Sequence, residues 1–357
     1  MSTLQISLAV AGGLVLAGVV AHSAWSTRKN LPKRATPREP APEPAPSAGV
    51  PLTLDADALA ERQEPSFDTD SGLQALTQLT LPDRRAGLDI LIDAMASVAL
   101  ESVVSGEAAL AAMPNTRRVG SKPFGVEGLS VANGEWEFPA AGHRYSAFQC
   151  GVQLANRTGA LNQIEYSEFV ITTQAFADAL DGQAEFPEMQ DEVARARELD
   201  QFASAHDAQL SFTLRANRTA WSPGYVQQSA ARLGFATGAI PGRMVLPANQ
   251  PGHAPILGLA FDTQAAMADD PEQTALRELT LSLDVPQVLR SEQPFARMCE
   301  LAIALAGSMD GVIIDDNGNF IRPEAMEGIH ADLELLYDTL DGRDLSAGSA
   351  LGRRLFS

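Results

Sequence analysis

The stretch "MDGVIIDDNGNFIRPEAMEGIHADLELL", from Met309 to Leu336, decides the fold. Its first part places adjacent aspartates, asparagines and a glycine between apolar residues, which raises the question of a metal-binding loop. An EF-hand loop needs oxygen ligands at alternate positions and glycine at the sixth. Counted from Asp315, the glycine falls fourth, at Gly318, and Ile321 stands where a polar residue is expected. The register therefore excludes an EF-hand.

The same stretch predicts a hairpin followed by a helix. Asn317-Gly318 fits a two-residue type I′ turn, which needs positive φ at both central positions, and "GVIID" and "NFI" supply the short strands. Pro323 suits the first turn of a helix, which we expect to run to about Leu340. Apolar residues at helical spacing predict its buried stripe: Met326, Ile329, Leu333, Leu336, Tyr337 and Leu340.

Composition limits the possible functions. The chain has 357 residues, enough for about two domains, and a formal net charge of −19. The first forty residues are basic, so the remainder is even more acidic than the whole chain. Such a body repels nucleic-acid phosphate, which argues against DNA or RNA binding. The only two cysteines, Cys150 and Cys299, lie in unrelated contexts and fit a reducing compartment.

The N-terminus carries an apolar run, "LQISLAVAGGLVLAGVVAHSAW", from Leu4 to Trp25. Its length matches the ~20 residues that a helix needs to cross a bilayer, so we expect a transmembrane helix at residues 4–26. The alternative is a cleaved signal peptide, which would leave a periplasmic protein. A positive n-region is missing, although small residues at Ala21–Ala24 keep cleavage open.

Residues that follow the run predict the orientation. An aromatic residue at the interface and basic residues on the cytoplasmic side are typical of a membrane anchor; here these are Trp25, Arg28, Lys29, Lys33 and Arg34. We therefore expect a single-pass protein of the cell inner membrane, with the N-terminus periplasmic and the C-terminal domains cytoplasmic.

The rest of the chain divides into a linker, two folded parts and a tail. Residues 27–80 are rich in proline and predict a disordered spacer. Folded α+β domains are expected at 81–205 and 206–341, each an antiparallel sheet with helices on one face. Residues 342–357 are left as a C-terminal tail. We expect this tail to be disordered; the alternative is a docking motif formed by Arg353, Arg354, Leu355 and Phe356.

Periodicity places the elements of both domains. Strands are expected at 88–95, 146–154, 168–176, 209–217, 243–246, 255–261 and 278–285. Helices are expected at 106–113, 186–202, 222–235 and 294–309. The two halves share an order of strand, helix, strands and long helix, with 146–154 matching 255–261 and 168–176 matching 278–283. This order predicts two related domains; chance similarity between α+β domains is the alternative.

No motif predicts catalysis. The five histidines do not pair at metal-ligand spacing, and the sequence lacks a GxSxG elbow, a P-loop and a GxGxxG after a strand. We expect no enzyme activity, no cofactor and no metal. A tethered protein that works by binding remains.

The sequence resembles a known family, the ZipA cell-division proteins. The resemblance lies in the anchor, the proline-rich linker, "LTLSLDVPQ" at Leu279–Gln287 and the quoted stretch from Met309, and it covers roughly Ala208–Asp341. It implies a protein that tethers FtsZ, the tubulin-like division GTPase, to the membrane and supports septum assembly. It also implies a shallow apolar groove on the open face of the second sheet that binds the FtsZ C-terminal peptide. The family has one such domain, so the resemblance does not explain residues 81–205. The shared order of elements predicts that these residues are a diverged copy of it.

The sequence departs from the family at this groove. Positions that the resemblance assigns to partner binding are small or polar: Ser211, Thr213, Ala260, Asp262 and Ser282. Only Ile240 and Met244 would add apolar area. Loss of a few hundred Å² of apolar contact at ~25 cal/mol/Å² weakens binding by several kcal/mol. The peptide would therefore bind weakly, in another pose, or on the first domain.

A second class of function stays open at this stage. The protein would then be a structural or assembly protein of the envelope, whose duplicated domains self-associate or bind another membrane protein.

Overall fold

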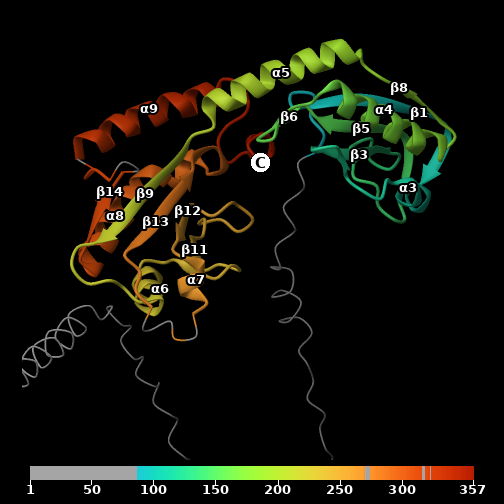
Figure 1. The fold of residues 1–357 in the computed structure, drawn as a ribbon. Coiled ribbons are helices and arrows are strands. Elements are labelled where there is room, and N and C mark those ends of the chain that lie inside the picture. The colour runs from blue at the N-terminus through green and yellow to red at the C-terminus, as the bar shows by residue number, and fades with distance from the viewer. Residues whose placement is uncertain (1–86, 269, 271–273, 316–317, 322) are drawn as a thin grey trace, which may run out of the picture.

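A computed structural model describes residues 87–357, with 269, 271–273, 316–317 and 322 excepted. The expected membrane helix at 4–26 and the linker at 27–80 therefore lie outside the described residues. Within the described part, no helix combines the length and apolarity needed to span a bilayer. In the described residues, two six-stranded antiparallel sheets, a two-stranded sheet and their helices make up an α+β structure (Figure 1).

The first sheet has the strand order β2-β3-β5-β1-β8, and β4 pairs with β3. We call this sheet and its helices the first domain. Its helix α4 packs on one face of the sheet, where Phe169 and Phe176 place their rings 6.1 Å and 5.2 Å from those of Phe124 and Phe148. The elements are β1 (Asp93–Ser105), α3 (Gly106–Ala112), β2 (Arg118–Val119), β3 (Lys122–Ser130), β4 (Trp136–Glu137), β5 (Arg144–Gln153), β6 (Ala155–Asn156), β7 (Gly159–Ala160), α4 (Gln163–Asp178), β8 (Gly182–Glu185) and α5 (Met189–His206).

The second sheet has the order β10-β11-β12-β13-β9-β14, and with its helices it forms the second domain. Helix α8 packs on the sheet, and the Phe295 ring lies 6.3 Å from that of Phe212 in β9. The elements are β9 (Gln209–Ala216), α6 (Pro223–Arg232), β10 (Ala236–Thr237), β11 (Arg243–Leu246), β12 (Leu257–Ala260), α7 (Thr263–Ala266), β13 (Glu278–Asp284), α8 (Pro294–Met309), β14 (Gly311–Ile314) and α9 (Pro323–Asp341).

Several sequence predictions are confirmed in the second domain. Ser222 caps α6 by accepting a hydrogen bond from the Tyr225 amide, and Gly234 just beyond that helix has φ +93°. Helix α8 has the predicted bounds. In α9, the predicted stripe packs into the core, with Leu333, Tyr337 and Leu340 buried.

The expected strand at 168–176 is wrong, because this segment lies in α4. A capping box starts that helix: the Asn162 side chain accepts from the Glu165 amide, and the Glu165 carboxylate accepts from the Asn162 amide. The β-rich composition of the segment is overridden by this local start signal. The matching of 168–176 with 278–283 therefore fails. The expected strand at 88–95 is also displaced, since a turn through Asp89 precedes β1.

The predicted hairpin at the quoted stretch is present, with a different turn. Ile314 bridges Phe320, and the Asp315 amide donates to Asn319 O at 2.9 Å. Three residues therefore lie between Asp315 and Asn319, which bond to each other, instead of the two residues of a type I′ turn. Asn317 itself lies outside the described residues, and Gly318 has φ +81°.

The tail is ordered, contrary to expectation. Residues Ala350–Leu355 form α10, and Leu355 and Phe356 are buried. Arg354 Nη2 donates to Asp93 Oδ1 at 2.6 Å in the first domain. Gln287 Nε2, just after β13 of the second domain, donates to Phe356 O at 2.7 Å. Helix α10 therefore joins the two domains.

A second contact between the domains lies at Arg157. Its guanidinium donates to Asp207 Oδ1 at 2.6 Å and to Asp284 Oδ1 at 2.7 Å. Asp207 follows the long helix α5, and Asp284 ends β13. Because one arginine holds both carboxylates, it fixes the end of the helix against the second sheet.

We predict that Phe356→Ala lowers the free energy of unfolding by about 3–5 kcal/mol, because it leaves a cavity where α10 packs. Urea denaturation of the wild type and the variant measures this change. Phe320→Ala is the matched control, because Phe320 is 71 % exposed, and it should change stability by less than about 0.5 kcal/mol. Equal effects of the two substitutions would contradict a packed α10.

Candidate functional site

The open face of the second sheet gathers four of the predicted binding residues. The register pairs Ser211 with Ser282, and Thr213 and Ala260 both with Thr280. Directly paired residues point to the same face of a sheet. Ser211, Thr213, Ala260 and Ser282 therefore share the face that the helices leave uncovered.

The other three predicted residues lie elsewhere. Met244 is 2 % exposed and pairs with buried Leu259, so it faces the helices and cannot contact a partner on the open face. The side-chain alternation of β11 places it there. Ile240 is exposed in the turn before β11. Asp262 caps the short helix α7 by accepting from the Gln264 amide at 2.9 Å.

The open face of the second sheet is polar, as the sequence predicts. Thr280 lies between Thr213 and Ala260, and next to this row Arg215 forms an ion pair with Glu278 at 2.7 Å. Hydroxyls and an exposed ion pair offer hydrogen bonds, but they bury little apolar area. This face alone gives a peptide with apolar side chains a weak driving force.

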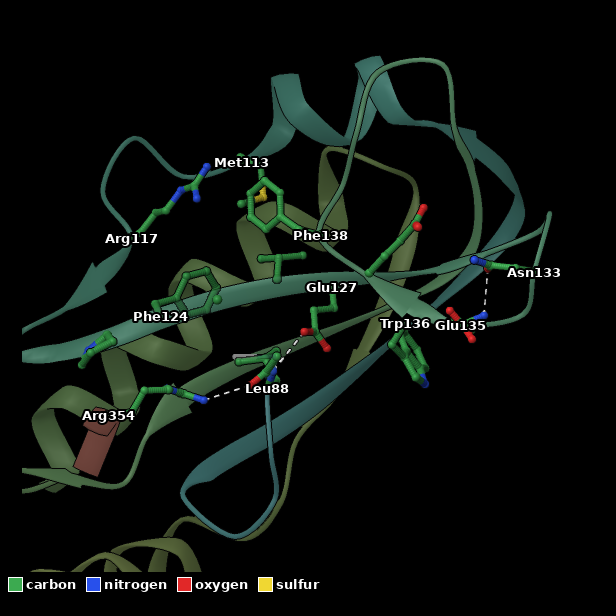
Figure 2. A pocket seen from close by; sticks show the side chains of 15 residues that line it. Leu88, Met113, Arg117, Phe124, Glu127, Asn133, Glu135, Trp136, Phe138 and Arg354 are labelled. Atoms are coloured by element: carbon green, nitrogen blue, oxygen red, sulfur yellow. Dashed lines mark hydrogen bonds between the residues drawn. The ribbon is translucent and has the colours of Figure 1, made fainter. Parts of the chain in front are cut away.

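A larger concave surface lies on the first domain. A cavity of about 820 Å³ opens beside β3, and Figure 2 shows the residues around it. Apolar side chains dominate its wall: Leu88, Met113, Phe124, Trp136 and Phe138. Trp136 and Phe138 are 44 % and 41 % exposed. Trp136 also lines a smaller cavity of about 320 Å³, which lies over β1 and the end of β8.

The cavity lies where the outer edge of β3 is interrupted. On that edge, β2 pairs with Lys122 and Pro123, and β4 pairs with Gly128 and Leu129. Within the described part of the chain, residues 124–127 have no strand partner on that side. A free strand edge presents unpaired backbone donors and acceptors.

Most charged side chains around the cavity already form hydrogen bonds within the protein. Glu127 accepts from the Leu88 amide at 3.0 Å and from Gln149 Nε2 at 2.7 Å. Glu137 Oε1 lies 2.5 Å from His143 Nδ1 and accepts from the Tyr145 hydroxyl at 3.1 Å. The hydrogen bond with His143 is the main cause that lowers the pKa of Glu137. Arg117 differs: its guanidinium lies 4.4 Å from the Phe138 ring centroid.

Comparison with known protein families finds a match for part of the second domain. Residues 264–332 match the family model described as ZipA, C-terminal FtsZ-binding domain. The matched part runs from α7 to the middle of α9 and includes β13, α8 and β14. The resemblance to ZipA is thus confirmed over residues 264–332, which lie in the second domain. No curated protein matches the chain.

The ZipA match bears on the class of activity. The ZipA C-terminal domain is a protein-binding domain of cell division and belongs to no enzyme family. The match of residues 264–332 to this domain supports an FtsZ-binding role in cell division. The match leaves the first domain, with its cavity, outside its range.

Sequence reasoning missed the first-domain cavity. Strand β3 was not predicted, although "KPFGVEGLS" alternates buried and partly exposed residues along its whole length. The signal was present in "EWEF", Glu135 to Phe138, where large aromatic residues alternate with carboxylates. Only Trp136 and Glu137 form a strand, β4, and Phe138 just beyond it lies on the other side of β3 from Trp136 (Figure 2).

We predict that His143→Ala raises the pKa of Glu137 toward its ordinary value. The folded-state pKa of Glu137 is lowered, so its carboxylate stabilises the fold above the unfolded-state pKa. This contribution is lost as the pH falls through the folded-state value. A carbon-13 NMR titration of the carboxyl group measures the change. His330→Ala is the control, because His330 is an exposed residue of α9 in the second domain, and it should leave the Glu137 titration unchanged. An unchanged titration in His143→Ala would contradict the assignment.

Proposed function

We propose that this protein is a non-enzymatic cell-division protein of the inner membrane. It tethers FtsZ to the membrane by binding the FtsZ C-terminal peptide, and it supports assembly of the Z-ring and the septum. The observation that carries the proposal is the match of residues 264–332 to the ZipA C-terminal FtsZ-binding domain.

The arrangement of the second domain is consistent with peptide binding. Its sheet is covered by helices on one face, and the other face presents Ser211, Thr213, Ala260 and Ser282. An extended or helical peptide can lie on such a face. Because this face is polar, we expect a modest affinity for the peptide. Contacts with a second surface would raise that affinity. Ile240 and Asp262 lie outside the strands and would contact only a peptide that extends beyond the face.

The membrane tether is part of the proposal and follows from the sequence. An apolar run at residues 4–26, followed by basic residues, is typical of an anchor with its C-terminal side in the cytoplasm. The proline-rich composition of residues 27–80 is typical of a spacer that extends by ~3.1 Å per residue. A domain on such a spacer reaches past the membrane surface to an FtsZ filament.

We further propose that the two domains arose by duplication. When β2, β4, β6, β7, β10, β11, α7 and the 3-10 turns are left out, both follow the order strand, helix, two strands, helix, strand, helix. The elements that remain are β1-α3-β3-β5-α4-β8-α5 and β9-α6-β12-β13-α8-β14-α9. In each, the first strand lies between the third main strand and the last: β3-β5-β1-β8 and β12-β13-β9-β14. This correspondence pairs β5 with β13 and α4 with α8, which differs from the pairing that the sequence suggested.

We predict that the purified full-length chain binds FtsZ, and that removal of the FtsZ C-terminal peptide abolishes binding. Fluorescence anisotropy of the labelled peptide measures the affinity, which we expect in the micromolar range, about −8 kcal/mol or weaker. Absence of binding at about 1 mM peptide, with the fold confirmed by circular dichroism, would rule out this function.

We predict that deletion of residues 4–26 moves the protein from the membrane fraction to the supernatant of lysed cells, because the deletion removes the only long apolar run. Immunoblotting of the fractions measures this shift. In dividing cells, an N-terminal fluorescent fusion of the intact chain should form a ring at midcell. A uniform membrane signal would instead favour an envelope assembly role.

A further inference from the structure

We propose that the interrupted outer edge of β3 in the first domain is a second peptide-binding site. It takes an extended segment with apolar side chains, an acidic residue at one end and a basic residue at the other. The occupant that we propose is the FtsZ C-terminal peptide, so the inference rests on the proposed function. The match to ZipA does not reach this domain, so the site extends binding beyond the matched region.

Backbone geometry supplies the first argument. The Phe124 amide donates outward to Arg117 O at 3.0 Å, and the Ser130 amide donates outward to Glu135 O at 3.0 Å. Successive residues of a strand direct their N–H and C=O groups to opposite sides, so Val126 also directs its groups outward. No strand of the described part pairs with Val126 on that side. A peptide strand added here would bond to it.

The size of the gap sets the length of the occupant. Residues 124–127 lie between the segments that β2 and β4 cover. Because Arg117 O already accepts from the Phe124 amide, the open stretch is 125–127. At ~3.3 Å per residue it spans about 10 Å, which is room for about three residues in a strand. The cavity of about 820 Å³ leaves space for their side chains. Binding would therefore join β2 and β4 into one continuous edge.

Apolar side chains flank the gap on both sides of the sheet. In Figure 2, Met113 and Phe138 lie on one side of β3, and Leu88 and Trp136 lie on the other. Side chains of an added strand alternate between these two sides. The site therefore favours apolar residues at neighbouring positions, whereas the open face of the second sheet offers mainly hydroxyls.

Charged residues at the two ends of the cavity favour one orientation of the bound peptide. Arg117 and Glu135 lie at opposite ends of the cavity in Figure 2, and both are exposed. Among the ion pairs of the described residues, neither of them takes part. The Arg117 guanidinium lies over the Phe138 ring, which leaves its N–H donors available for a carboxylate. An acidic residue would therefore lie toward β2 and a basic residue toward the β3–β4 turn.

Hydrogen exchange tests the edge directly. The full-length chain in nanodiscs is incubated with FtsZ or with FtsZ that lacks its C-terminal peptide. We expect exchange in residues 122–129 to slow by about tenfold only with intact FtsZ, because the added strand protects the Val126 amide. Residues 163–178, in α4 of the same domain, serve as an internal reference. General stabilisation of the fold would slow their exchange too, whereas a strand added at β3 leaves it unchanged.

A charge reversal tests the direction of binding. Arg117→Glu should weaken the affinity for FtsZ about tenfold, the loss of one favourable charge contact and the gain of a repulsive one. Arg343→Glu is the matched control, since Arg343 also lies over an aromatic ring, that of Phe202, at 4.5 Å. The control should bind as the wild type does. Thermal denaturation confirms that both variants are folded.

The outcomes separate the two proposals. If FtsZ binds but residues 122–129 remain unprotected and the two arginine variants behave alike, the edge site is overturned and the proposed function stands. If FtsZ does not bind the wild type at all, the function is overturned and this inference falls with it. Protection together with a selective loss in Arg117→Glu supports both.

Discussion

The ion pair between Arg354 and Asp93 is the contact on which the arrangement of the two domains depends. Asp93 begins β1 and is fully buried, and Arg354 comes from α10 at 2.6 Å. Burial raises the pKa of Asp93, and the Arg354 guanidinium opposes that rise. Removal of one partner from such a pair is strongly destabilising, because it leaves an uncompensated charge inside the protein. The first strand is therefore stable in its place only when α10 is docked.

A second constraint is that each sheet has helices on one face only. This arrangement leaves two other faces of different chemistry in one chain. The second domain, which matches ZipA in part, presents hydroxyls and an exposed ion pair. The first domain presents aromatic residues beside an incomplete strand edge. Under the two binding proposals, weak contacts at surfaces that α10 holds in fixed relation would together give a higher affinity, through the high local concentration of the second contact.

The sequence predicted the second domain well, because its strands alternate cleanly and its helices carry start and stop signals. Ser222 and Gly234 bound α6, and Pro294 opens α8 at the predicted residue. The first domain was harder. The segment 168–176 is rich in β-branched and aromatic residues, and only the capping box from Asn162 to Glu165 shows that it is a helix. In this segment the residue composition predicts a strand, whereas the capping box predicts a helix, and the structure has the helix.

The site was predicted in part. The alternation of β9 and β13 placed Ser211, Thr213 and Ser282 on one face, but the register of β11 put Met244 on the other. Short strands such as β11 offer too few residues to fix their phase from sequence. The cavity beside β3 depends on residues from Leu88 to Arg354 that are far apart in the chain. No local pattern announces such a site, because it exists only after the chain has folded.

Helix α10 has a consequence for the cooperativity of the whole protein. Its contact with Asp93 joins residues 261 positions apart, and its other contacts reach Gln287 beyond β13. Neither domain can unfold alone without exposing the apolar face of this helix. The two domains should therefore melt in one transition, although each has its own sheet. The binding free energy of a ligand on either domain then stabilises both domains. A partner bound to one surface therefore also protects the other domain against unfolding.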